Sequence, residues 1–208
     1  MSSSSRSSSP PVIDRPSSSP CSAVVSTDVG IVDKILALHA ALDAARLPHA
    51  FGGALALAWC TQRARGTIDI DVNVFVDQTQ AGTVFDALPA EVARSATELA
   101  HCLRDGQVRL WWAATPIDVF TNTTDFHIAA ADRAVVHEFA SHDVPFLCCS
   151  DVAVFKAFFN RTKHWADIEE MVAADTLDGD LVLGALVHYL GRDDARVERL
   201  TALLTTDQ

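Results

Sequence analysis

The chain has 208 residues, of which 49% are hydrophobic, and carries a formal net charge of −11 at pH 7. This suffices for one globular domain, or one domain with a small helical appendage, and no apolar run is long enough to span a membrane. The acidic balance argues against broad, non-specific nucleic-acid binding, so a nucleic-acid substrate would need a local basic patch.

Residues 1–28 differ in composition from the rest of the chain. They are rich in Ser and Pro and contain no apolar segment like that of a secretory signal. We predict either a disordered tail or a start codon assigned too early, with periodic sequence beginning near Val29.

The five cysteines have no CxxC spacing and are odd in number. Without a secretory signal, this pattern favours a reducing compartment, and we expect a cytoplasmic protein. Cys148 and Cys149 lie in an apolar run, which predicts buried thiols.

The hydrophobic pattern of residues 29–149 mixes the helical period with the two-residue period of strands. It predicts helices over 31–47, which Thr27 or Asp28 would cap, and over 54–60, 79–88 and 91–104. It predicts strands over 49–51, 68–74, 107–112, 117–120, 134–139 and 144–149, with a turn at 113–116. From Ser150 onward the pattern is helical, over 151–160, 163–174, 180–189 and 193–204. This order predicts an α+β core over 29–149 and a helical C-terminal subdomain over 150–208.

Two glycines, Gly52 and Gly53, come between a predicted strand and a predicted helix. The free backbone N–H groups at the start of a helix can hold a phosphate. Taken alone, the pair is also compatible with a simple turn.

The strand over 68–74 alternates apolar residues with Asp69, Asp71 and Asn73. Both carboxylates therefore point to the same face of the strand. Carboxylates about 7 Å apart repel each other unless a cation lies between them, and hard oxygen ligands suit Mg²⁺ or Mn²⁺. The ordinary alternative is an amphipathic strand with one solvated face.

Asp118 also lies between apolar residues, in the strand over 117–120. It would supply a third carboxylate if this strand lies beside that of Asp69. A two-metal site for phosphoryl or nucleotidyl transfer needs at least three such groups. Taken alone, Asp118 is more often a solvated strand residue.

Lys156 lies among apolar residues of a predicted helix, and Arg161, Lys163 and His164 follow it. This is the densest basic cluster in the chain, and it could hold a triphosphate or an RNA backbone. The alternative is a solvated junction between two helices. Asp167 lies four residues after Lys163, a spacing that allows an ion pair along one helix.

Together these residues resemble the AbiEii/MenT-type nucleotidyltransferase toxins, a branch of the DNA-polymerase-β-like nucleotidyltransferase superfamily. The resemblance covers roughly Val29 to Ala174 and departs from the wider superfamily at Gly53, where many members have serine. It rests on Gly52, Gly53, Arg63, Thr67, Asp69, Asp71, Asp118, Lys156 and the segment 160–168.

The resemblance implies a minimal nucleotidyltransferase fold, a short mixed sheet with flanking helices. It implies a toxin of a toxin–antitoxin pair that adds nucleotides from an NTP to the 3′ end of tRNA and thereby stops translation. Asp69 and Asp71 would bind Mg²⁺, and Asp118 would be a third metal ligand that helps to activate the tRNA hydroxyl. The triphosphate would be held by Gly52, Gly53, Arg63 and Lys156, with Lys163 and Asp167 placing Lys156 or the nucleotide.

The resemblance also implies a partner, a cognate antitoxin that is kinase-like in some members. Such an antitoxin would phosphorylate Thr67, two residues before Asp69. Two other functions remain open: a nucleotidyltransferase that modifies a small molecule or a protein, which the acidic pI favours slightly, and a non-catalytic partner that only binds nucleotide or protein.

Overall fold

The computed structural model describes residues 29–63 and 66–206. The Ser- and Pro-rich tail and the predicted caps Thr27 and Asp28 lie outside the described residues. A seven-stranded mixed sheet is flanked by helices, which confirms the predicted α+β class.

The sheet has the strand order β3-β4-β5-β2-β1-β7-β6. The β2 and β5 strands pair in parallel, as do β1 and β7, and the other neighbours are antiparallel. The strands are β1 (His49–Phe51), β2 (Ile70–Asp77), β3 (Val92–Ala93), β4 (Gln107–Trp112), β5 (Thr115–Asn122), β6 (Val135–Phe139) and β7 (His142–Phe146).

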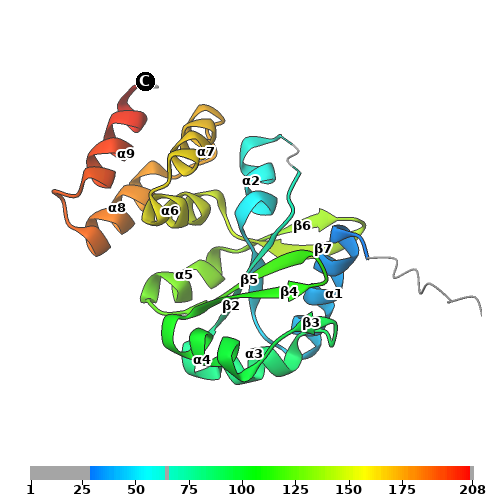
Figure 1. The fold of residues 1–208 in the computed structure, drawn as a ribbon. Coiled ribbons are helices and arrows are strands. Elements are labelled where there is room, and N and C mark those ends of the chain that lie inside the picture. The colour runs from blue at the N-terminus through cyan, green and yellow to red at the C-terminus, as the bar shows by residue number, and fades with distance from the viewer. Residues whose placement is uncertain (1–28, 64–65, 207–208) are drawn as a thin grey trace, which may run out of the picture.

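Helices cover both faces of the sheet (Figure 1). One face carries α1 (Ile31–Ala44), α3 (Ala81–Ala87), which follows the short 3-10 helix η1 (Gln78–Gln80), and α4 (Ala96–Asp105). Toward the other face lie α2 (Gly53–Thr61), α5 (Asp125–Arg133) and the C-terminal helices α6 (Cys149–Phe159), α7 (Thr162–Ala173), α8 (Gly179–Leu190) and α9 (Ala195–Thr206). In the part of the chain that the structure describes, no helix is long and apolar enough to cross a membrane.

The alternation in β2 separates the core from the second face of the sheet. Ile70, Val72 and Val74 are fully buried, whereas the intervening side chains, Asp71 among them, project from the opposite face. The prediction fails at the start of this strand. Ile68 is 81% exposed, and Asp69 lies in a bend just before β2. The strand begins only at Ile70, because the two residues before it still belong to the connecting loop.

Three other local predictions are wrong. The residues before α4 form the short strand β3 rather than the start of a helix, and the turn between β4 and β5 contains only Ala113 and Ala114. The α5 helix has no counterpart in the sequence prediction, because Phe126 and Ala130 alone are buried on it, and two apolar residues make a weak helical pattern.

Cys149 is not the free thiol that the sequence pattern predicts. It begins α6 and forms a disulfide with Cys60 in the last turn of α2, with a Cα–Cα distance of 5.4 Å. The two residues are 89 positions apart, and only the packing of α2 on α6 brings them together. Cys148 is free and half-buried.

Candidate active site

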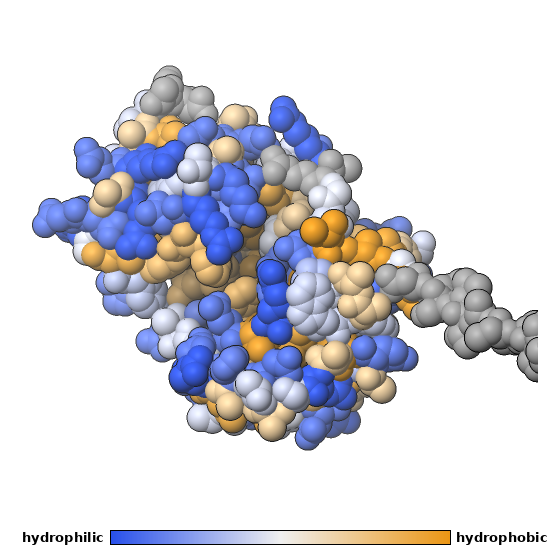
Figure 2. Space-filling model, viewed as in Figure 1, coloured by the Kyte–Doolittle hydropathy of each residue, from blue (hydrophilic) through white to orange (hydrophobic). Residues whose placement is uncertain are grey.

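A cavity of about 730 Å³ lies between the sheet and the helices α2, α6 and α7, and residues of α4, which packs on the other face of the sheet, line its edge. Figure 2 shows the surface hollowed between the C-terminal helices and the body that contains the sheet, with hydrophobic side chains on the floor of the hollow. Most of the candidate residues identified in the sequence line this cavity: Gly53, Asp69, Asp71, Asp118, Lys156, Lys163 and Asp167.

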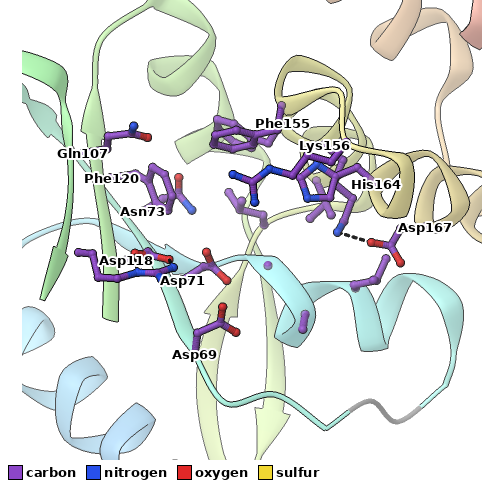
Figure 3. A pocket seen from close by; sticks show the side chains of 18 of the residues that line it. Asp69, Asp71, Asn73, Gln107, Asp118, Phe120, Phe155, Lys156, His164 and Asp167 are labelled. Atoms are coloured by element: carbon purple, nitrogen blue, oxygen red, sulfur yellow. Dashed lines mark hydrogen bonds and ion pairs between the residues drawn. The ribbon is translucent and has the colours of Figure 1, made fainter. Parts of the chain in front are cut away.

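The three candidate carboxylates meet where β2 and β5 lie side by side (Figure 3). Asp71 and Asp118 are direct partners in the parallel register of these strands, so their side chains emerge together from the same face. Asp69 precedes β2 and joins them at the same end of the cavity. The strand of Asp118 therefore lies beside the strand of Asp71, as a third carboxylate at this site requires.

The surroundings of Asp71 change the acidity of its carboxyl group. Burial and the neighbouring negative charges of Asp69 and Asp118 raise its pKa from 3.8 to about 6. Such a carboxylate is stabilised when a cation approaches it.

The donor set fits a hard divalent cation such as Mg²⁺ or Mn²⁺ at Asp69 and Asp71, because both oxygen donors face the cavity and repel each other electrostatically. Asp118 is held differently, by the side chain of Arg109. Within residues 29–63 and 66–206, no three acidic, His or Cys side chains converge closely enough to hold an ion as they stand.

The start of α2 lies against Asp71. Gly53 has φ +54°, and a Cβ atom there would lie 1.8 Å from Asp71 Oδ2, so the position requires glycine on both grounds. Backbone hydrogen bonding within α2 begins with Ala56 N–H donating to Gly52 O. The N–H groups of the first turn therefore remain for a ligand beside the carboxylates.

Basic side chains of α6 and α7 form the opposite wall. Lys156 Nζ donates to Asp167 Oδ2 at 2.7 Å, a mostly buried ion pair that joins the two helices. Arg161 and Lys163 are exposed at the rim. His164 is 9% exposed, and its Nδ1 atom has no hydrogen-bond partner among the described residues.

Three predicted residues do not line the cavity. Gly52 precedes Gly53, and its N–H donates to Asp71 O at 2.9 Å, so it holds the start of α2 against β2. Arg63 is exposed and ends the described segment that follows α2. Thr67 Oγ1 donates to Asp69 Oδ1 at 2.7 Å and so contacts the site through that carboxylate.

No protein-family model and no curated protein matches the sequence. Two solved structures of the antibiotic-resistance factor ANT(2″)-Ia are similar to the chain. A crystal structure with adenylyl-2″-tobramycin gives a TM-score of 0.51 at 17% identity, over 85% of this chain and 97% of that one. A solution structure gives 0.50 at 15% identity, over 85% and 90%. The fold is that of the nucleotidyltransferases. The AbiEii/MenT branch within that fold stays a prediction.

A row of residues next to the carboxylates was not predicted from the sequence. Arg109 on β4 pairs with Asp118, and one step along the sheet Gln107, Phe120 and Asn73 lie in register across β4, β5 and β2. All of them line the cavity. The polar–apolar alternation of β4 marks Arg109 and Gln107 as residues of one face, but the pattern alone does not say which strand lies beside them.

The wall formed by α4 was also missed. Glu98, His101 and Asp105 line the cavity from this helix. The cavity thus has an acidic side at α4 and a basic side at α6 and α7.

Proposed function

We propose that the protein is a metal-dependent nucleotidyltransferase. An acceptor hydroxyl would attack the α-phosphorus of an NTP, a new phosphoester bond would form, and pyrophosphate would leave as the bond between the α- and β-phosphates breaks. The observation that carries this proposal is the meeting of Asp69, Asp71 and Asp118 with the start of α2 in a cavity whose far wall holds Lys156.

Carboxylates of the chain would bind the metal ion, and its cationic and N–H groups would bind the phosphates. Asp69 and Asp71 would hold Mg²⁺ or Mn²⁺, which supplies positive charge against the phosphates and lowers the pKa of a bound hydroxyl. The N–H groups at the start of α2 and the Lys156 ammonium would bind triphosphate oxygens. Arg161 and Lys163 are further groups for the nucleotide or the acceptor.

For the acceptor we propose the 3′ end of tRNA, and for the cellular role a cytoplasmic toxin that blocks translation. Support comes from the AbiEii/MenT resemblance and from Arg161 and Lys163, whose exposed side chains at the rim give an RNA backbone cationic partners despite the acidic chain. We also propose that a cognate antitoxin regulates the toxin.

Thr67 gives that antitoxin a place to act. Its hydroxyl hydrogen-bonds the Asp69 carboxylate, so a phosphate there would replace a donor with about −1.5 to −2 charges beside the metal ligands. We expect mass spectrometry of protein co-expressed with a kinase-like antitoxin to find phospho-Thr67. Active-site peptides that stay unmodified while activity is suppressed would contradict this regulation.

A cationic small molecule is the second candidate acceptor. Glu98 and Asp105 on the α4 wall favour it, because a polyanionic RNA would be repelled there. The ANT(2″)-Ia crystal structure contains an adenylylated small molecule, tobramycin.

Transfer of label from each α-³²P-NTP tests the proposal. The acceptors, total tRNA and a panel of aminoglycosides, are tested separately in the presence of Mg²⁺. Three proteins are compared: the wild type, Asp69→Asn and the control Asp86→Asn, which lies on the exposed surface of α3. We expect label at the tRNA 3′ end with the wild type and the control only. Label on aminoglycosides alone would replace tRNA with the second candidate. No transfer to either acceptor class would contradict the proposed acceptors, and equal transfer by Asp69→Asn would place the chemistry elsewhere.

A further inference from the structure

Arg109 and Asp118 form a two-pronged ion pair across β4 and β5. They are direct partners in the antiparallel register. Arg109 Nε donates to Asp118 Oδ1 at 2.8 Å, and Nη2 donates to Oδ2 at 2.6 Å. Both carboxylate oxygens of Asp118 are therefore engaged by one guanidinium group.

The same guanidinium acts on the whole carboxylate cluster. Arg109, Asp118 and Asp71 stand in one row across β4, β5 and β2, so the cation lies two strands from Asp71. Its positive charge partly offsets the repulsion that Asp69 and Asp118 exert on the Asp71 carboxylate. The cluster thus contains three carboxylates and a permanent cation that belongs to the chain.

The ion pair between Arg109 and Asp118 lies at the surface of the cavity, where Arg109 can move away into solvent. The Arg109 side chain is 52% exposed and the Asp118 side chain 18% exposed, so water can solvate the guanidinium once it leaves. A bidentate pair is stronger than an ordinary surface ion pair, but with the guanidinium half-exposed it costs less to break than a buried pair.

We propose that Arg109 is a resident cation that competes with a divalent metal ion for Asp118. With Arg109 in place, Asp69 and Asp71 alone are open to a metal; when Arg109 swings out, Asp118 becomes the third ligand and a free base for the acceptor hydroxyl. Arg109 is then a positioning residue that sets how tightly the site binds metal. This inference rests on the proposed function, because it takes the carboxylates to be metal ligands.

Binding of Mn²⁺ alone, followed by the electron paramagnetic resonance signal of the free ion, tests the competition without any substrate. Four proteins are compared: wild type, Arg109→Gln, Asp118→Asn and the double variant. We expect Arg109→Gln to bind Mn²⁺ about fivefold more tightly, since one partly exposed ion pair no longer has to open. In the Asp118→Asn background the same Arg109 change should alter the affinity by less than about twofold.

Two results would overturn the inference. An equal gain from Arg109→Gln in both backgrounds would assign the effect to the lost charge alone, and no gain in either would mean that Arg109 does not compete. Matching thermal melts of the four proteins exclude misfolding as the cause. If neither wild type nor Arg109→Gln binds Mn²⁺, the inference fails together with the proposed metal site, and the label-transfer assay decides the function separately.

Discussion

Gly53 shows how a single backbone position shapes the site. Its φ of +54° is left-handed, and its missing Cβ leaves the space that the Asp71 carboxylate occupies. A serine, which many members of the superfamily that the sequence resembles have at this position, would collide through its Cβ with Asp71 in this backbone.

We expect Gly53→Ala to lower the free energy of unfolding by about 1–2 kcal/mol, because an L-residue is strained at this φ. It should also weaken Mn²⁺ binding, since the new methyl group displaces Asp71. Gly82→Ala is the matched control: Gly82 lies in α3 with open space around its Cβ position, so alanine should stabilise that helix by up to about 1 kcal/mol. Urea denaturation compares the two variants. Equal effects on stability would contradict the argument.

Asp71 should make the stability of the metal-free protein depend on pH. Its pKa is about 6 in the fold, against 3.8 ordinarily, so the folded state holds the proton more tightly than the unfolded state. Its contribution to stability is therefore largest at low pH and is lost as the pH rises from about 4 through about 6.

Asp71→Asn removes this titration. In EDTA, the difference in free energy of unfolding between Asp71→Asn and wild type should grow in favour of the variant as the pH is raised from 4.5 to 7.5. Mg²⁺ should restore the wild type at the higher pH, because it binds the ionised carboxylate. A difference that stays constant across this range would mean that the pKa of Asp71 is not raised.

At the scale of elements, the disulfide between Cys60 and Cys149 ties together two walls of the cavity. The α2 helix carries Gly53 and α6 carries Lys156. A reducing compartment would open this bond, so whether it forms depends on the redox conditions around the protein.

We expect reduction by dithiothreitol to lower the free energy of unfolding by about 2–4 kcal/mol, because the loop closed by the disulfide is long. Cys60→Ser should show the lower value with and without reductant. Alkylation of Cys60 and Cys149 in native protein without reductant would contradict the disulfide.

The ion pair between Lys156 and Asp167 is the second link between elements, here between α6 and α7. We expect Asp167→Asn to raise the Kd for NTP about fivefold, the effect of losing about 1 kcal/mol of lysine orientation. Asp180→Asn, on the exposed surface of α8, should leave the Kd unchanged. Tighter binding by Asp167→Asn would show that Asp167 competes with the triphosphate for Lys156 rather than positioning it.

The sequence predicted that Asp71 and Asp118 share a face of the sheet, but the turn between β4 and β5 hid the pairing of Arg109 with Asp118. The alternation of β2 and β5 is strong enough to place Asp71 and Asp118 on one face, and the structure pairs them. The four-residue turn predicted at 113–116 would have set Trp111 opposite Asp118. The actual two-residue turn uses alanines, which give no turn signal, and Pro116 lies within β5, where proline argues against a strand. The resulting shift in register is what brings Arg109 to Asp118.

At the scale of the whole molecule, one cavity has walls of opposite charge. The basic side comes from α6 and α7, the acidic side from α4, and the carboxylates lie on the sheet between them. A sequence shows each cluster but not which clusters face one another, because that depends on how helices distant along the chain pack around the sheet. The charge of −11 describes the average surface, and the acceptor depends on the local arrangement.

The most direct test of the central claim is metal-dependent binding of a non-hydrolysable NTP, measured by calorimetry with α,β-methylene analogues in Mg²⁺ and in EDTA. It needs no acceptor. We predict binding in Mg²⁺ by the wild type and by two controls on exposed residues outside the cavity, Asp86→Asn and Arg192→Ala. Asp71→Asn and Lys156→Ala should each weaken binding at least about tenfold, the equivalent of 1.4 kcal/mol. No binding of any analogue by the wild type, or equal binding by all five proteins, would contradict an NTP site between the carboxylates and Lys156.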